Sequence, residues 1–477
     1  MDTARRIRAL LVAVVVTAGG AQAASPAFEA VRKVAETVGT PSAQFILGQM
    51  YEHGQGTDPN PGKALHYYRL AAEQGYAKAQ YRLGLAYLEG LPGLRPDPAQ
   101  GRRWLARAAA QGHVEAQYRL GLALLEAGQI PEGAQWLITA AASGHREAQY
   151  RTARLFLRGE GVPADPIEAQ RWMEEAAEQG HRAAARELAE LLLSGAAGPP
   201  RPDQALHWLR WAADQGDAEA ALAIARLYEG GDGLPADPAR AVEWYRRAAE
   251  AGLRAAYAPL ARHLLELGRT AEAEPWLEKA ARAGNADAAL TLARLRLDAG
   301  RVQAALPWLR QAAEAGRPEA QRRLGLLLRA GAHGLPADPP RAVWWLTRAA
   351  EGGDAQAAYV LGRLYLDGRG VARNARLARR WLEAARQGGE RRPILLRLLG
   401  RLYLYGQGGE KDEARGLDLL RQAAGAGDAE AAFLLAEFHA ARGGEGDLAE
   451  AERWYRRAAE LGHAGAQERL GLSFAAE

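Results

Sequence analysis

Apolar residues recur at helical spacing along most of this chain, in short segments that end at glycine. In the segment 148–157 they return every three or four positions, which is typical of a helix with one buried face. Gly159 ends the segment, because glycine readily adopts the left-handed conformation of a helix C-cap. Asp165, which is followed by proline, predicts the start of a second helix, and Gly180 predicts its end. The pattern therefore predicts a pair of helices.

This helix pair is repeated twelve times along the chain. Each copy closes with Ala-Ala, two variable residues and glycine, from Ala71 in the first copy to Ala458 in the last. The copies follow one another at intervals of roughly 32 to 39 residues, a period that indicates a helical solenoid. In such a fold each unit contacts only its neighbours, and the product is an extended binding surface. We therefore expect an all-α solenoid of about twelve antiparallel helix pairs plus a terminal helix.

Tryptophan supports the same register. Most tryptophans lie about four positions before the closing Ala-Ala pair, on the helix face that carries the alanines. Small alanines let two helices approach closely, and we predict that each indole packs into the space beside them. The predicted structural packing residues are Trp104, Trp136, Trp172, Trp208, Trp244, Trp276, Trp308, Trp345, Trp381 and Trp454.

The N-terminal segment differs from the repeats. Three arginines precede an apolar run from Ala9 to Ala18, and Ala21-Gln22-Ala23 fits a small-x-small cleavage pattern. This order is typical of a secretory signal peptide. The alternative is a buried first helix.

We therefore expect three segments: a signal peptide at 1–23, an N-terminal capping helix at 24–40 and the solenoid at 41–477. The protein would then be exported, and either periplasmic or secreted. The apolar run is too short to span a bilayer as a resident helix. The chain contains no cysteine that a lipid could modify. We expect neither a membrane span nor a lipid anchor.

Charge and composition argue against several kinds of chemistry. The net charge is only +4, whereas nucleic-acid binding usually needs a concentrated positive stripe, so we expect no nucleic-acid partner. The sequence contains no zinc-protease helix motif, phosphate-binding loop or nucleophile elbow. We therefore expect a protein that is not an enzyme, with no catalytic residue, cofactor or metal.

Four histidines follow closing glycines and can be interpreted either as a ladder of metal ligands or as residues at the solvent edge of a helix start. Equivalent positions of stacked helices lie about 8–10 Å apart, whereas zinc needs ligand atoms at about 2 Å from one ion. The spacing therefore favours the second interpretation. These histidines are His113, His145, His181 and His463.

The repeat resembles the Sel-one-like repeat (SLR) family, a relative of the tetratricopeptide repeat, over about residues 41–477. The motif is carried in one copy by Ala77, Ala79, Leu83, Gly84, Tyr87, Gly90, Asp97, Trp104, Ala108, Ala109 and Gly112. The resemblance implies a right-handed superhelix. It also implies an adaptor function, since family members mostly act as adaptors and many bacterial members are exported.

By analogy with tetratricopeptide-like units, the first helix of each pair is expected to line the concave side. Two positions on that helix are then candidates for partner binding. One lies three residues before the Leu-Gly glycine, or the alanine that replaces it, and includes Tyr81, Tyr118 and Tyr150. The other directly follows that residue and includes Arg154, Arg226, Arg262, Arg294, Arg363 and Arg401. Alternatively, these arginines only pack their stems beside neighbouring helices.

Two functions remain open for such a surface. The first is a non-enzymatic scaffold in the bacterial cell envelope that binds a protein or peptide in the solenoid groove. The second is the binding of an acidic polysaccharide along the row of arginines, because guanidinium groups suit carboxylates. A hydrolase is a further alternative, for which no motif was found.

Overall fold

The computed structural model describes residues 25–90, 94–230, 233–331 and 335–471. Within these residues the chain folds into twenty-six α-helices and one 3-10 helix, with no extended strand. The prediction of an all-α fold is therefore confirmed. The signal peptide predicted at 1–23 lies outside the described residues.

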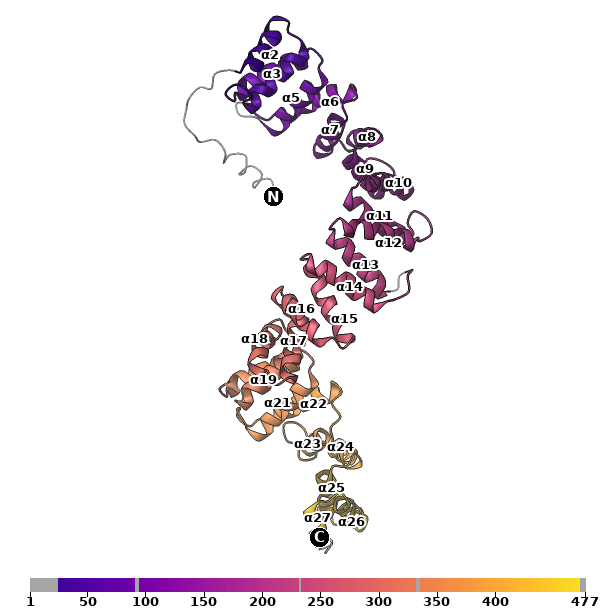
Figure 1. The fold of residues 1–477 in the computed structure, drawn as a ribbon. Helices are drawn as coiled ribbons and strands as arrows, with labels where there is room; N and C mark the ends of the chain where they lie inside the picture. Colours follow the sequence, from indigo (N-terminus) through magenta and orange to yellow (C-terminus); the bar gives the residue numbers. More distant parts are fainter. Residues whose placement is uncertain (1–24, 91–93, 231–232, 332–334, 472–477) are drawn as a thin grey trace. The chain divides into compact units, whose positions relative to one another are not determined.

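The chain divides into two compact units, and in each unit successive helices lie against one another in pairs (Figure 1). The unit up to Ala251 contains α2 (Pro26–Thr37), α3 (Pro41–His53), α4 (Pro61–Glu73), α5 (Ala77–Glu89), α6 (Pro98–Ala110), α7 (Val114–Glu126), α8 (Ile130–Ala142), α9 (Arg146–Arg158), α10 (Pro166–Glu178), α11 (Arg182–Ser194), α12 (Pro202–Asp214), α13 (Ala218–Gly230) and α14 (Pro238–Glu250).

The unit from Gly252 has the same organisation. It contains η1 (Arg254–Ala256), α15 (Tyr257–Glu266), α16 (Thr270–Arg282), α17 (Ala286–Asp298), α18 (Val302–Glu314), α19 (Pro318–Ala330), α20 (Pro339–Glu351), α21 (Ala355–Asp367), α22 (Ala375–Gln387), α23 (Pro393–Leu404), α24 (Glu413–Gly425), α25 (Ala429–Arg442), α26 (Glu445–Glu460) and α27 (Ala464–Arg469). None of the helices in the described part of the chain has the length and apolar character needed to cross a membrane.

Local sequence signals set the helix boundaries. The Asp165 side chain accepts hydrogen bonds from the backbone N–H groups of Ile167 and Glu168, and proline takes the first position of α10. At the other end of the pair, Gly180 has a φ of 85°, which favours glycine. The helix start and end predicted from Asp165 and Gly180 are therefore confirmed.

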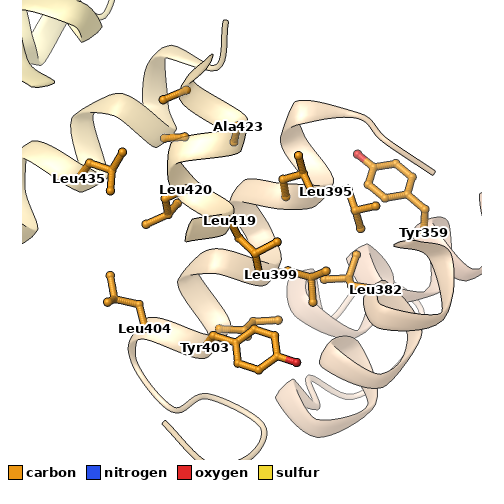
Figure 2. Close-up of a cluster of buried hydrophobic side chains, with 14 of the residues drawn as sticks. Tyr359, Leu382, Leu395, Leu399, Tyr403, Leu404, Leu419, Leu420, Ala423 and Leu435 are labelled. Carbon is orange, nitrogen blue, oxygen red and sulfur yellow. The ribbon is translucent and has the colours of Figure 1, made fainter. Parts of the chain in front are cut away.

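The Leu-Gly motif of the first helix permits close contact with the second. A Cβ atom at Gly362 would lie 2.5 Å from the Cγ of Leu382, which no real Cβ could tolerate. Leu382 is fully buried and belongs to a cluster that continues through Leu399 and Leu420 (Figure 2). The glycine therefore lets the two helices of a repeat pack leucine directly against backbone.

The predicted tryptophans lie at the edge of the core, and several pack against its buried residues. Trp172 and Trp381 are buried, at 6% and 7% exposure, but the other eight indoles of the predicted set are partly exposed at the edge of the core. The deeper position belongs to the residue that follows each indole. These buried residues are Leu105, Leu137, Met173, Leu209, Tyr245, Leu277, Leu309, Leu346, Leu382 and Tyr455.

The ends of the solenoid are covered by single helices in the described residues. In α2, Phe28 and Ala35 are buried against the first repeat, whereas Val34 and Val38, which follows the helix, are exposed. The N–H of Ser25 also donates to the carbonyl of Gly56. At the other end, α27 buries Ala466 in the cluster of the last helix pair.

Candidate functional site

The first helices carry one position that joins each repeat to the next, which we call the junction position. It is the residue three before the Leu-Gly glycine or its alanine replacement. At three junctions a tyrosine stacks on the histidine that opens the next first helix, with ring centroids 4.3 to 4.8 Å apart. The pairs are Tyr81 with His113, Tyr118 with His145, and Tyr150 with His181.

Each of these histidines is also a helix cap. The Nδ1 atom of His145 accepts a hydrogen bond from the N–H of Ala148 at 3.1 Å, and its Nε2 lies 3.0 Å from a carboxylate oxygen of Glu115 in the previous repeat. His181 repeats this arrangement with Glu147. In the described residues no group of three or more histidine, aspartate or glutamate side chains could hold a metal ion. The recurring histidines are therefore capping residues in this structure.

Other junctions use charge instead of aromatic rings. Arg322 Nε donates to the Oδ2 atom of Asp354 at 2.8 Å, while the other carboxylate oxygen of Asp354 caps α21. Arg397 and Asp428 form the same pair at 3.0 Å. Aspartate can cap a helix and pair with arginine through its two oxygens. At these junctions the contact between repeats thus has one of two self-consistent chemistries.

A buried glutamine precedes several junction residues, and the sequence analysis overlooked it. Gln80 Nε2 donates to the carbonyl of Ala72 in the previous repeat at 3.1 Å, and its Oε1 accepts from Gln111 at 2.7 Å. Gln149 repeats this with Ala141 and Gln179. A buried amide needs such partners. The recurring Ala-Gln-Tyr of the first helices is the signal that could have revealed it.

The three tyrosines predicted to bind a partner are thus occupied by contacts between repeats. Tyr118 is only 8% exposed, and Tyr81 and Tyr150 are partly buried. Burial raises the pKa of the Tyr150 hydroxyl, and its hydrogen bond to Glu187 adds to the rise. Their binding role stays a prediction, and their observed contacts join repeats.

The predicted arginines lie on a second position, which we call the furrow position because it borders the furrow between successive first helices. Arg154 is partly buried there and donates to the Tyr150 hydroxyl at 3.3 Å. The other five are exposed: Arg226, Arg262, Arg294, Arg363 and Arg401. Within this set, Arg262 lies 3.7 Å from Glu266 and Arg294 lies 4.0 Å from Glu319.

The furrows differ in chemistry along the chain. Between α5 and α7, a hollow of about 430 Å³ has Leu85 and Leu122 at the furrow positions, and its charged lining residues are Glu89, Glu126, Arg102 and Arg119. On the two sides of α21, hollows of about 570 and 520 Å³ each have four arginines in their lining and share Arg363.

A larger hollow of about 880 Å³ opens where the junction position is small. Ala258 occupies the place of the stacked tyrosines, and Asn285 takes the place of the histidine. Pro259 also interrupts the first helix, which begins as η1 and continues as α15 from Tyr257. Proline cannot donate the backbone hydrogen bond that a continuous helix would need there. The hollow is lined mainly by alanine, leucine and proline, and the charged residues of its lining include Arg262 and Glu266, which form an ion pair.

Glu52 is a carboxylate of the first unit with a lowered pKa, and its role is structural. Burial would raise the pKa of Glu52, but hydrogen bonds from Tyr68 and Arg82 outweigh it and lower that pKa. The Tyr68 hydroxyl lies 2.5 Å from Glu52 and is itself deeply buried. A carboxylate held ionised by an arginine is poorly suited to general acid catalysis. This cluster therefore gives no support to a hydrolase.

Comparison with known proteins places these observations in context. A family model for the Sel1 repeat matches most of the chain in twelve copies. The matched residues are 41–76, 77–113, 114–145, 146–181, 182–217, 218–253, 271–285, 302–316, 318–354, 355–390, 395–428 and 429–463. Two of the matches, 271–285 and 302–316, cover only part of a repeat.

A crystal structure of a protective antigen from uropathogenic Escherichia coli, described as having an SLR fold, is 29% identical, with a TM-score of 0.59 over 94% of this chain and 98% of the other. A Sel1 repeat protein from Oxalobacter formigenes is 28% identical over 53% of this chain and 90% of its own, with a TM-score of 0.31. An uncharacterised protein of Neisseria meningitidis serogroup B is 33% identical over 172 residues. That match spans 29% of this chain and 36% of the relative's length.

Proposed function

The chain belongs to the Sel1 repeat family, and we propose on this basis that it is an exported, non-enzymatic scaffold of the bacterial cell envelope, binding a partner protein or peptide along its first helices. Proteins built of Sel1 repeats generally act as scaffolds for protein interactions. The N-terminal pattern of Arg5, Arg6 and Arg8 followed by an apolar run supports export. The uropathogenic relative is described as a protective antigen, which is compatible with this location.

One observation carries the proposal: exposed arginines recur at a single position of the first helices, while the residues around that position are used to hold repeats together. Arg226, Arg363 and Arg401 have no ion pair among the described residues. Exposed guanidinium groups that the fold does not need are available to a partner. Within each unit, contacts between neighbouring repeats hold in place the first helices that carry these groups.

Site-specific photo-crosslinking in the producing cell tests this proposal. A photoreactive amino acid replaces Arg363 on α21 in one variant and Arg380 on α22, a second helix, in the matched control. We expect a protein adduct from position 363, and little or none from 380. The adducted partner is then purified and its binding to the isolated scaffold measured by calorimetry.

Absence of any protein adduct at 363 and at the equivalent positions 226 and 401 would overturn the scaffold proposal. Retention of an acidic polysaccharide by the purified protein, lost with rising salt and after Arg226→Glu and Arg294→Glu, would support polysaccharide binding instead. Fractionation of the cell tests export: the mature chain should be found outside the cytoplasm and should begin after residue 23.

A further inference from the structure

Two hollows flank α21 in the second unit. The hollow towards α19 has a volume of about 570 Å³ and is lined by Arg329, Arg363, Arg369 and Arg392. The hollow towards α23 has a volume of about 520 Å³ and is lined by Arg363, Arg373, Arg397 and Arg401. Arg363 and Asp367 line both hollows, so the two form one groove across α21, which we call the α21 groove.

The α21 groove has an excess of positive charge that the fold does not neutralise. Asp367 is the one acidic residue among those that line the two hollows. It lies 4.0 Å from Arg369, while Arg397 is paired with Asp428 at 3.0 Å and Arg392 lies 3.4 Å from Glu390. The described residues provide no ion pair for Arg329, Arg363 or Arg401. These three guanidinium groups can therefore take acidic groups from outside.

The floor of the groove is rigid and partly apolar. Tyr359 is 4% exposed, and the guanidinium groups of Arg363 and Arg392 lie 5.9 and 5.2 Å from its ring centroid. Figure 2 shows Tyr359 beside Leu395 in the buried cluster of this unit. Ile394, which is 41% exposed, lines the second hollow.

The buried tyrosine ring positions the two guanidinium groups that lie over it. The exposed aliphatic side chain of Ile394 can contact apolar groups of a ligand.

We propose that the α21 groove binds a short acidic peptide segment of the partner, in which carboxylates alternate with aliphatic residues. This inference rests on the proposed function, because the segment would belong to the protein that the scaffold holds. Carboxylates would pair with Arg329, Arg363 and Arg401, and the aliphatic residues would cover Ile394. A protein segment supplies both kinds of group, whereas an acidic polysaccharide supplies only the carboxylates.

The equivalent furrow between α5 and α7 provides an internal contrast. Its furrow positions carry Leu85 and Leu122 in place of Arg363 and Arg401, and its lining has two acidic residues, Glu89 and Glu126, and two arginines, Arg102 and Arg119. This lining has no excess of positive charge to attract an acidic segment. Binding should therefore be weaker at this furrow than at the α21 groove, although both furrows have the same backbone design.

Fluorescence anisotropy on the full chain tests the inference with a fluorescein-labelled peptide of alternating glutamate and leucine. We expect saturable binding that weakens as salt rises. Arg363→Glu should weaken it about tenfold, because the reversal removes an attraction and adds a repulsion in both hollows. Arg380→Glu is the matched control, since it makes the same charge change at an exposed position of α22 that lines neither hollow, and it should change affinity less than about twofold.

Arg363→Gln provides a second variant in which only the attraction is lost, and circular dichroism establishes that each variant is folded. A peptide of glutamine and leucine should not bind measurably. The inference is overturned by an absence of saturable binding, by equal losses in the Arg363 and Arg380 variants, or by tighter binding of polygalacturonate than of the acidic peptide at this groove. If a partner identified by crosslinking still binds the Arg363→Glu protein unchanged, the inference fails while the proposed function stands.

Discussion

The repeats at 77–181 and those at 318–428 are built on the same helix pair but differ at two positions. The first group joins its repeats by tyrosine stacked on histidine and has leucine at the furrow position between α5 and α7. The second group has arginine paired with aspartate at two junctions, with Tyr359 at the junction position of the helix between them, and has arginine along the α21 groove. The junction and furrow positions thus vary while the closing alanines and the packing leucines stay. The comparison shows that the surface chemistry of the solenoid changes without changing its construction.

The largest effect should come from the packing that the two groups share. Leu137 is fully buried and packs directly against Gly121, where a Cβ would lie only 2.8 Å from the leucine Cγ. Removing the leucine side chain should therefore leave a cavity in the core. We expect Leu137→Ala to cost about 2–5 kcal/mol of unfolding free energy, as for other buried leucines. Leu382→Ala in the second group should cost a similar amount, because that residue has the same environment. Thermal and denaturant unfolding followed by circular dichroism measure both.

Trp136→Ala should cost less, about 1–3 kcal/mol, because part of the indole already faces water. A larger loss for Trp136→Ala than for Leu137→Ala would show that the indole contributes more to the packing than the fully buried leucine does.

The sequence predicted the helix pairs well because their signals are local. Asparagine or aspartate before proline starts a helix, and glycine at positive φ ends one, wherever the chain places them. How deep each tryptophan lies in the core is a distinction that these local signals do not make. Adjacent residues of a helix lie only about a quarter turn apart, so periodicity alone does not separate Trp136 from Leu137. The family motif marks the tryptophan, but depth in the core depends on the neighbouring helix.

The candidate site was predicted only in part. Arg363 and Arg401 are exposed as a binding residue must be, but Tyr81 and its equivalents hold repeats together. That role depends on a pairing between one first helix and the cap of the next, a contact that a reading of each helix by itself cannot detect. The sequence does contain the signal: tyrosine is followed one repeat later by histidine, and Arg322 is followed by Asp354.

Converting an arginine–aspartate junction into a tyrosine–histidine junction tests the comparison directly, and its expected effect on stability is intermediate. Arg322→Tyr alone leaves the largely buried Asp354 without its arginine and should cost about 1–3 kcal/mol. Adding Asp354→His should recover about 1 kcal/mol, because the new histidine can stack on the tyrosine and cap α21. Glu319 already occupies the helix position that Glu115 has in the histidine junction. Thermal unfolding of the two single variants and the double variant measures the coupling between positions 322 and 354. Additive losses of stability would show that the two junction residues do not act as a pair.

The smallest effect should be a difference in acid sensitivity. Burial lowers the pKa of His113 and Lys78 lowers it further, although Glu115 opposes them. Lys78 takes the helix position that carries glutamate beside His145 and His181, and the Nδ1 of His113 accepts from the N–H of Ala116 at 3.2 Å. The folded state therefore favours neutral imidazole.

Its stabilising contribution is complete above the unfolded pKa of about 6.5 and is lost as the pH falls through the lowered folded value. In His113→Asn the asparagine can still cap α7 but cannot titrate, so the variant should lose less stability on acidification than the parent chain. After solvent screening we expect the difference to stay below about 1 kcal/mol. Melting temperatures measured on either side of about pH 6.5 test this. If acidification lowers the melting temperatures of the parent chain and the His113→Asn variant equally, the histidine caps do not make the first group of repeats more sensitive to acid than the second.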